Sequence, residues 1–316
     1  MSVAAPRVEI PPHAPEGVWS RRLLGPFHTT GVFWVRLHRF GVCVMPDWAV
    51  RILVTLFTCF FFIVLRRVGA AIAANVDAVL GPCGWRERQA RVFRTMRSFA
   101  WCLSERYERL STSRQFTLES DGWETWQELN ATGEGVVLLT AHMGNWEMGS
   151  MLPSTQEARR VHLVREAETD PRAQRFLSEL LRSSSSELYT THFAEDPQLG
   201  MFLLDALRHG DLVALQGDRP RCGGKVEEVE LFGRPFPLPV GPAALARAAG
   251  APILPVFFFR EGRLRYRCSI RQPIHVERTG DRQRDLEEAM KRFAAELQSS
   301  IAQHPHQWFC FRKVWN

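Results

Sequence analysis

The sequence predicts an α/β fold in which a mainly parallel central sheet is flanked by helices, with a hydrophobic helix in front of it. Short apolar runs typical of buried strands alternate with longer segments of helical pattern; the runs lie at 136–140, 212–215 and 253–259. A polar cluster follows the run at 212–215 directly, which is where open α/β sheets place their sites. With 45% hydrophobic and 23% charged residues, the 316-residue chain has the composition of a globular protein.

Three parts are expected along the chain. Residues 1–30 form a flexible tail, because four prolines within its first 15 residues disfavour regular structure, and it lacks the layout of a secretory signal. Residues 31–68 form a membrane-associating helical segment, and residues 69–316 form the α/β domain. No internal repeat or long linker divides this last part.

Segment 31–68 carries the features of a membrane anchor. Its apolar run at 52–65 has 14 residues, short of the ~20 of a transmembrane helix, so we expect it to dip into one leaflet; a full span is the alternative. Arginines at both ends of the run can reach lipid phosphates. The stretch 31–42 fits either an interfacial amphipathic helix or a helix packed on the main domain.

The charge distribution favours a membrane over nucleic acid as a partner. The formal net charge is +6, and residues 1–70 contribute +5 of it, with eight arginines against three acids. A basic leader suits nucleic acid or an anionic membrane surface. Because an apolar run lies inside this leader and no nucleic-acid-binding motif is recognised, we expect a membrane partner and no nucleic acid.

The cysteines and histidines give no indication of a metal site. The seven cysteines are odd in number and scattered, without a C-x-x-C pair, which indicates reduced thiols in a cytoplasmic compartment and no disulfide framework. His142 lacks the partner of an H-E-x-x-H helix. His304 and His306 are interpreted as tail residues rather than ligands. We therefore expect neither a metal nor an organic cofactor.

The remaining elements are expected to support the sheet. Residues 69–110 have a helical pattern with a break at 81–84, and 286–301 carry an apolar helical stripe that predicts core packing. Pro242 is well placed to begin a helix over 243–249. The alternation in 264–270 predicts a strand at a solvent-exposed edge of the sheet.

The stretch 136–150 carries the clearest chemistry. A strand-type run ends at Thr140, and His142 follows it, with Glu147 four intervening residues later. Gly144 and Asn145 favour a turn between them, after which a helix could begin. A base oriented by an acid suits acyl transfer from a thioester to a hydroxyl, and because no serine or cysteine lies beside His142, direct attack by the hydroxyl is the simpler mechanism.

This stretch resembles a known family. The segment A-H-M-G-N-W-E resembles the H-x4-D/E block of the glycerolipid-type acyltransferases, in particular the branch with the late (lauroyl/myristoyl) acyltransferases of lipid A biosynthesis. Further similar blocks are R-R-x4-I-x-x-N at 66–75, F-G-x-P…P-x-G-P-x-x-L-A from Phe232 onward, and the final P-x-Q-W-F-x-F. The resemblance covers residues 30–316 and implies the glycerolipid acyltransferase fold.

The resemblance also implies roles for single residues. His142 would be the general base and Glu147 its partner, with Gly144 and Asn145 of the same block near the substrate. Arg165, after a short strand at 161–164, matches an arginine that contacts the phosphate or carrier part of a substrate. The remaining candidates are substrate contacts after the strand 212–215 and residues that line the acyl region: Asp218 and Arg219, and Phe232, Gly233 and Pro239.

These observations predict a membrane-associated, monomeric O-acyltransferase at the cytoplasmic face of the bacterial inner membrane. Its donor would be an acyl-carrier protein or acyl-CoA, and its acceptor a glycolipid such as a lipid A precursor. A lysophospholipid, an amino-acid lipid or another specialised lipid is an alternative acceptor. A non-catalytic lipid-binding membrane protein and a thioesterase are the rival functions. Arginine stands at 219, where the lipid A enzymes often have glutamine, so the acceptor stays open.

Overall fold

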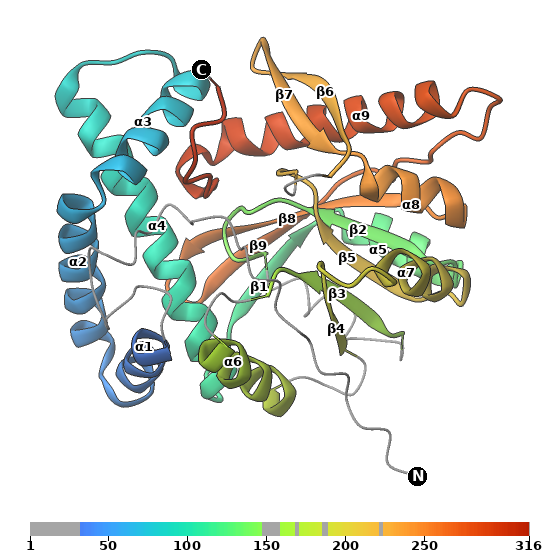
Figure 1. Ribbon diagram of the computed structural model, residues 1–316. Helices are drawn as coiled ribbons and strands as arrows, with labels where there is room; N and C mark the ends of the chain where they lie inside the picture. The colour runs from blue at the N-terminus through green and yellow to red at the C-terminus, as the bar shows by residue number, and fades with distance from the viewer. Residues whose placement is uncertain (1–31, 147–158, 168–170, 185–188, 221–223, 316) are drawn as a thin grey trace.

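The computed structural model describes residues 32–146, 159–167, 171–184, 189–220 and 224–315. A seven-stranded sheet forms its centre and confirms the expected α/β class (Figure 1). In spatial order the strands are β1 (Thr117–Asp121), β9 (Arg265–Ile270), β8 (Ile253–Gly262), β2 (Val136–Thr140), β5 (Leu212–Gln216), β3 (Val161–Arg165) and β4 (Tyr189–Phe193).

The sheet is mainly parallel. Five of its six neighbouring pairs are parallel, and only β8 and β9 run antiparallel to each other. The predicted solvent-edge position of 264–270 is wrong, because β9 lies between β8 and β1 and buries Tyr266 and Cys268. β1, the true edge strand on that side, is largely exposed. The alternation in the sequence thus reflected the two faces of an interior strand.

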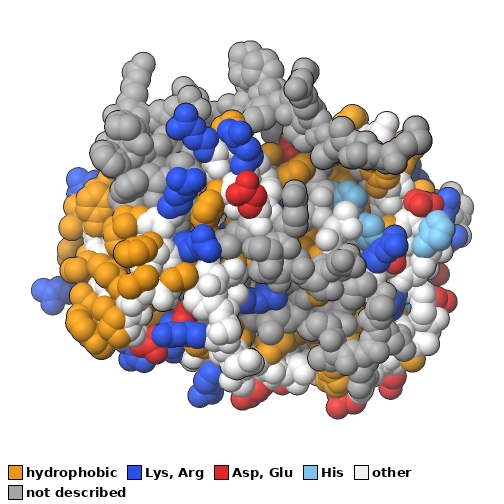
Figure 2. Space-filling view, turned by 90° about the horizontal axis from the view of Figure 1, so that it is seen from below, with side chains coloured by type: hydrophobic (Ala, Val, Ile, Leu, Met, Phe, Trp, Pro, Cys, Tyr) orange, Lys and Arg blue, Asp and Glu red, His pale blue; other side chains and the backbone are white. Residues whose placement is uncertain are grey.

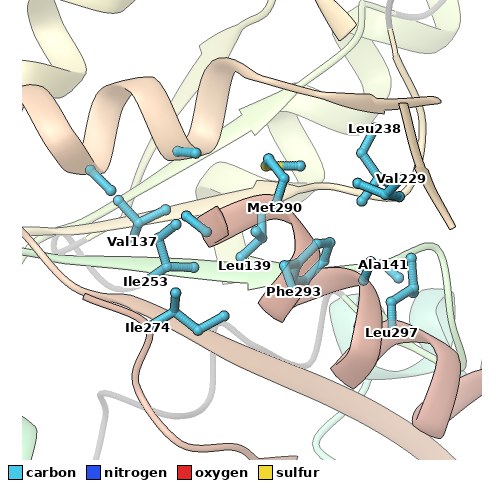
Figure 3. Close-up of a cluster of buried hydrophobic side chains, with 14 of the residues drawn as sticks. Val137, Leu139, Ala141, Val229, Leu238, Ile253, Ile274, Met290, Phe293 and Leu297 are labelled. Carbon is cyan, nitrogen blue, oxygen red and sulfur yellow. The ribbon is translucent and has the colours of Figure 1, made fainter. Parts of the chain in front are cut away.

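Helices cover both faces of the sheet. Alternate residues of the central strands point to opposite faces, as the pleat requires. Val137, Leu139 and Ile253 share one buried cluster with α7 (Leu199–Arg208), α8 (Gly241–Ala249) and α9 (Arg282–Gln303). Figure 3 shows how Met290, Phe293 and Leu297 of α9 pack against these side chains. The other face packs on Trp126 and Leu129 of α5 (Trp123–Ala131).

A hairpin and a C-terminal segment complete the α9 side of the molecule. Strands β6 (Val226–Leu231) and β7 (Arg234–Pro239) form an antiparallel pair over α9 (Figure 1). The chain after α9 forms a short 3-10 helix, η3 (Pro305–Gln307), and then crosses towards the N-terminal helices. α6 (Pro171–Ser184) lies near the N-terminal helices, on the β3 and β4 side of the sheet.

Four helices precede the sheet and pack as one layer beside it. They are α1 (Val32–Val44), α2 (Asp47–Val64), α3 (Arg66–Leu80) and α4 (Trp85–Ser111), and α4 contacts each of the other three. The expected N-terminal hydrophobic helix is present: α2 has 18 residues, most of them apolar. It begins after Pro46 and so is longer than the apolar run at 52–65. Among the described residues it is the one single helix long and apolar enough to cross a membrane.

One face of α2 packs on the protein and the other is exposed. Val50, Val54 and Thr58, spaced by one helical turn, are buried, and Trp101 of α4 lies in the same cluster as the two valines. The opposite face exposes large apolar side chains, including Trp48 (68%) and Ile63 (70%). The helix therefore lies on the domain along its length, with its second apolar face uncovered.

Candidate active site

The carboxyl ends of β2 and β5 bring together two segments that are far apart in the sequence. The parallel register pairs Thr140 with Gln216, the last residues of the two strands. His142 follows β2 by two residues and Asp218 follows β5 by two, so both lie at the same edge of the sheet. The N–H of Gly217 donates to the carbonyl of Thr140 at 2.8 Å and extends the pairing beyond the strands.

A hydrogen bond joins these two side chains. Nδ1 of His142 lies 2.7 Å from Oδ1 of Asp218, and the backbone N–H of His142 donates to the same oxygen at 3.1 Å. An ionised carboxylate only accepts hydrogen bonds, so in the neutral form of the ring Nδ1 carries the proton and Nε2 keeps its lone pair. The His142 side chain is 23% exposed. The pair therefore presents an oriented base.

Asp218 is held as a carboxylate although it is fully buried. Burial alone raises its pKa, but the imidazole of His142, the guanidinium of Arg219 and the indole N–H of Trp308 outweigh burial and hold the pKa below its usual range. Trp308 Nε1 donates to Oδ2 at 3.1 Å, and Arg219 Nε lies 3.7 Å from that oxygen. Both carboxylate oxygens thus have partners within the protein.

The loop after His142 requires a glycine. Gly144 has φ +52°, and a Cβ atom there would overlap the carbonyl oxygen of Phe258 on β8. A side chain at this position would be strained and would also push the loop away from the sheet. The glycine that the sequence assigned to the substrate region is therefore needed by the backbone that carries His142.

Asn145 lies inside the protein. Its side chain is 4% exposed and lies beside the hydroxyl of Tyr266, which in turn donates to the buried carboxylate of Glu105 on α4. Trp146, the next residue, places its ring 5.1 Å from the ring of His142, measured between centroids. Asn145 thus lies between the loop and Tyr266 of β9, and Trp146 flanks the base.

Two arginines that the sequence singled out lie at the same edge of the sheet. Arg219 donates through Nη2 to the carbonyl of Phe309 at 2.9 Å, and its side chain is 26% exposed. Arg165 ends β3, the neighbour of β5, so its strand lies ~10 Å from β2 at the usual strand spacing. The topology thus gathers His142, Asp218 and both arginines at one end of three adjacent strands.

The residues expected to line the acyl region belong to the hairpin. Phe232 (φ +53°) and Gly233 (φ +68°) form the two-residue turn between β6 and β7, a turn that needs positive φ at both positions. The backbone N–H of Phe232 donates to Oε1 of Gln298 at 2.6 Å, and the Phe232 ring packs on Trp315. Pro239 ends β7, paired with Val226. The expected loop is therefore a hairpin docked on α9 and the C-terminal segment.

Two expectations, the role of Glu147 and the lack of a metal site, involve parts of the chain that the structure does not describe. Glu147, and the helix expected after Trp146, lie outside the described residues, so the pairing of Glu147 with His142 stays a prediction. Within the described ranges, no group of three or more His, Cys, Asp or Glu side chains is arranged to hold a metal ion.

The sequence did not reveal that the C-terminal segment is part of the site. The N–H of Phe309 donates to the carbonyl of His142 at 2.8 Å, and the N–H of Gly144 donates to the carbonyl of Gln307 at 2.9 Å. Trp308, between them, reaches Asp218. The only signal was the motif P-x-Q-W-F-x-F, which marks a resemblance but contains no pattern that assigns a hydrogen-bond donor to an acid 90 residues away.

Comparison with known proteins gives consistent matches. A family model described as bacterial lipid A biosynthesis acyltransferase matches residues 22–316. A phosphatidylinositol mannoside acyltransferase from Mycobacterium tuberculosis (strain CDC 1551 / Oshkosh) is 30% identical over 185 residues, which are 58% of this chain and 56% of that protein. One from Mycolicibacterium smegmatis is 26% identical over 190 residues, 60% of this chain and 59% of that protein. The matches therefore span little more than half of each relative.

Among solved structures, the 1-acyl-sn-glycerophosphate (LPA) acyltransferase PlsC from Thermotoga maritima is similar, with a TM-score of 0.36 and 15% sequence identity. The match covers 78% of this chain and 96% of that chain.

Proposed function

Because this chain belongs to the bacterial lipid A biosynthesis acyltransferase family, we propose that it transfers a fatty acyl chain from a thioester to a hydroxyl group of a glycolipid. The observation that carries this proposal is the His142–Asp218 pair at the carboxyl edge of the sheet. A partly exposed imidazole whose tautomer is fixed by a buried carboxylate is the arrangement that general-base catalysis needs.

In the proposed mechanism, Nε2 of His142 removes the proton of the acceptor hydroxyl as its oxygen attacks the thioester carbonyl. The tetrahedral intermediate then collapses, the C–S bond breaks, and the sulfur leaves as a thiol with the proton from the imidazolium. The products are the ester and the free thiol. Asp218 stabilises the imidazolium between the two steps. General-base assistance of this kind is worth ~10²–10⁴-fold.

Asp218 is proposed to position His142 rather than to bind the acceptor, because its side chain is buried and both oxygens are occupied. Glu147 remains a second acid candidate in the same loop. Arg165 and Arg219 suit anionic parts of the substrates, such as phosphates, because guanidinium groups bind them with paired N–H donors. Phe232, Gly233 and Pro239 are proposed to lie along the acyl chain's side of the site.

Family and relatives support a glycolipid acceptor. The family description names lipid A biosynthesis, and the curated relatives are named as acyltransferases of phosphatidylinositol mannosides. The donor is proposed to be an acyl-carrier protein or acyl-CoA, and the acceptor a lipid A precursor or another glycolipid. A lysophospholipid or amino-acid lipid would require the same base and differ in the groups that meet the arginines.

The uncovered face of α1 and α2 supports a seat on the membrane surface. Figure 2 shows apolar side chains gathered on this side of the molecule with cationic side chains around them. Phe40, Trp48, Leu56 and Ile63 are each more than half exposed. The arginines at 36, 51, 66 and 67 are exposed on the same two helices and the start of α3. Because the other face of α2 packs on α4, we propose that α2 lies in the plane of one leaflet. The cytoplasmic face of the inner membrane is proposed from the family resemblance.

The deciding experiment is intact-lipid mass spectrometry of host cells that lack the gene. The cells are complemented with wild type or with His142→Ala, and the amount of each protein in the membrane fraction is measured. We expect a lipid heavier by one acyl chain with wild type alone, which would also name the acceptor and the chain. Identical lipids with both proteins would refute the transferase, and an increase in free fatty acid without a new ester would identify a thioesterase.

A further inference from the structure

Three segments of the chain border the site: the ends of β2 and β5, and the segment from Gln307 to Phe309. It lies along the His142 loop, with a β-bridge between Met143 and Trp308 and a backbone hydrogen bond on each side of that bridge. Trp308 is 3% exposed. The segment thus carries a fixed indole into the protein interior behind the base.

The indole N–H of Trp308 fixes the orientation of the Asp218 carboxylate. Oδ1 accepts from the backbone and the ring of His142, while Oδ2 accepts from Trp308 Nε1 at 3.1 Å. The other donor group near Oδ2, Arg219 Nε, lies at 3.7 Å, beyond hydrogen-bond distance. Without the indole donor, the buried Oδ2 would lose the hydrogen bond that fixes it, and the carboxylate could rotate towards Arg219 and away from His142.

The segment itself is held from two other directions. The side chain of Gln307 bonds both the N–H and the carbonyl of Arg260 on β8, at 2.8 and 2.9 Å. Asn75 of α3, which is 2% exposed, donates to the carbonyls of Cys310 and Arg312 at 3.0 and 2.8 Å. The position of Trp308 is therefore also set by the sheet and by α3, in addition to the His142 loop.

We propose that Trp308 is a positioning residue, whose indole N–H fixes the Asp218 carboxylate in the orientation that holds His142 as the base. The expected effect on kcat rests on the proposed acyl transfer, whereas the expected effect on the His142–Asp218 hydrogen bond does not. Because Trp308 is buried and its indole N–H bonds Asp218, it acts through Asp218.

The chain offers a matched control in Trp315. Its ring centroid lies 6.0 Å from that of Trp308, and it is also buried, at 6% exposure. Both indoles pack on Phe236. The Nε1 atom of Trp315, however, has no hydrogen-bond partner in the part of the chain that the structure describes. Tryptophan-to-phenylalanine substitutions at the two positions remove similar volumes, and only one of them removes a hydrogen bond to the site.

The structural test is the resonance of the His142 Nδ1–H proton in histidine-labelled, detergent-solubilised full-length protein. A hydrogen bond to a buried carboxylate shifts this proton far downfield, and His142→Ala identifies the signal. We expect Trp308→Phe to move it upfield or broaden it, and Trp315→Phe to leave it in place. An unchanged signal in Trp308→Phe, or equal changes in both variants, would overturn the proposal whatever the enzyme's substrate is.

The kinetic test uses palmitoyl-CoA and the lipid extract of the deletion host, with thiol release as the readout. We expect kcat of Trp308→Phe to fall about tenfold, equivalent to about 1.4 kcal/mol, with KM for palmitoyl-CoA within twofold of wild type. Trp315→Phe should keep both constants within twofold. A rise in KM alone, or a kcat loss that only follows the folded fraction, would overturn the positioning role. Activity in His142→Ala would instead refute the proposed function.

Discussion

The substitution Asp218→Asn tests the His142–Asp218 pair most directly. Asparagine has nearly the same shape, but one of its two ends donates hydrogen bonds. If its oxygen faces His142, its amide group meets the N–H of Trp308, which needs an acceptor at 3.1 Å. If its amide group faces His142, it meets the backbone N–H at 3.1 Å and forces Nδ1 to become the acceptor. Neither orientation satisfies all three donors.

The two orientations set the magnitude. In the first, a buried donor loses its partner, which costs ~1–3 kcal/mol. In the second, the proton moves to Nε2 and the ring cannot act as a base; the same tautomer error in the catalytic triad of a serine protease costs about 10⁴ in kcat. We therefore expect kcat to fall by between about fivefold and about 10⁴-fold, or about 1–5.4 kcal/mol, with less effect on KM.

The assay is thiol release from palmitoyl-CoA with the lipid extract of the deletion host, and Glu147→Gln is measured alongside. Thermal unfolding of each variant corrects for loss of folded protein. The reasoning would be refuted if Asp218→Asn kept more than a third of the wild-type kcat. A large loss in Glu147→Gln with none in Asp218→Asn would return the role of partner to Glu147, as the sequence alone suggested.

Two further predictions concern the N-terminal helices. Ile52 and Ile63 are 51% and 70% exposed, and replacing both by asparagine should lower sedimentation with vesicles of phosphatidylcholine and phosphatidylglycerol at least tenfold, because burying each isoleucine in the lipid is worth ~1.5–3 kcal/mol. Val226→Asn, on the β6 hairpin, is the exposed control. An equal loss of sedimentation in this control would contradict the membrane face. Burial lowers the pKa of His38 to about 4. Between pH ~6.5 and 4 the unfolded state therefore binds more protons than the folded state. The packing of α1 on α4 should be fully stable above pH ~6.5 and weaken as the pH falls below it. Hydrogen exchange of α1, corrected for intrinsic rates, should therefore rise from pH 7 to 5 in wild type but not in His38→Gln, and parallel curves would rule out this role of His38.

The fold class could be predicted because its signals are local. Runs such as 136–140 and 253–259 read as strands buried on both faces, and each proves to be interior. The same local signal failed at 264–270, where alternation was attributed to solvent rather than to two covered faces. Strand order cannot be obtained from alternation, because both an edge strand and an interior strand with unequal faces alternate.

The site could be predicted only in part for a similar reason. His142 lies in a recognisable block, and sequence proximity suggested Glu147 as its partner. Asp218 comes 76 residues later, and only the parallel register of β2 and β5 brings its carboxylate to His142. The polar residues after each strand did indicate the correct edge of the sheet. The strand order determines which of these residues contact each other, and the sequence pattern does not predict that order.

Strand β8 connects the N-terminal helices with the site. Glu105 of α4 is fully buried and bonds the guanidinium of Arg260 through both oxygens, each at 2.9 Å. Burying such a carboxylate is favourable only when its oxygens are fully paired, so α4 has little freedom to shift relative to β8. The backbone of the same Arg260 is held by Gln307, whose neighbour Trp308 reaches Asp218. The helices proposed to rest on the membrane are thus connected to the base by fixed, buried contacts, which would hold the site at a constant height above the lipid surface from which the acceptor comes.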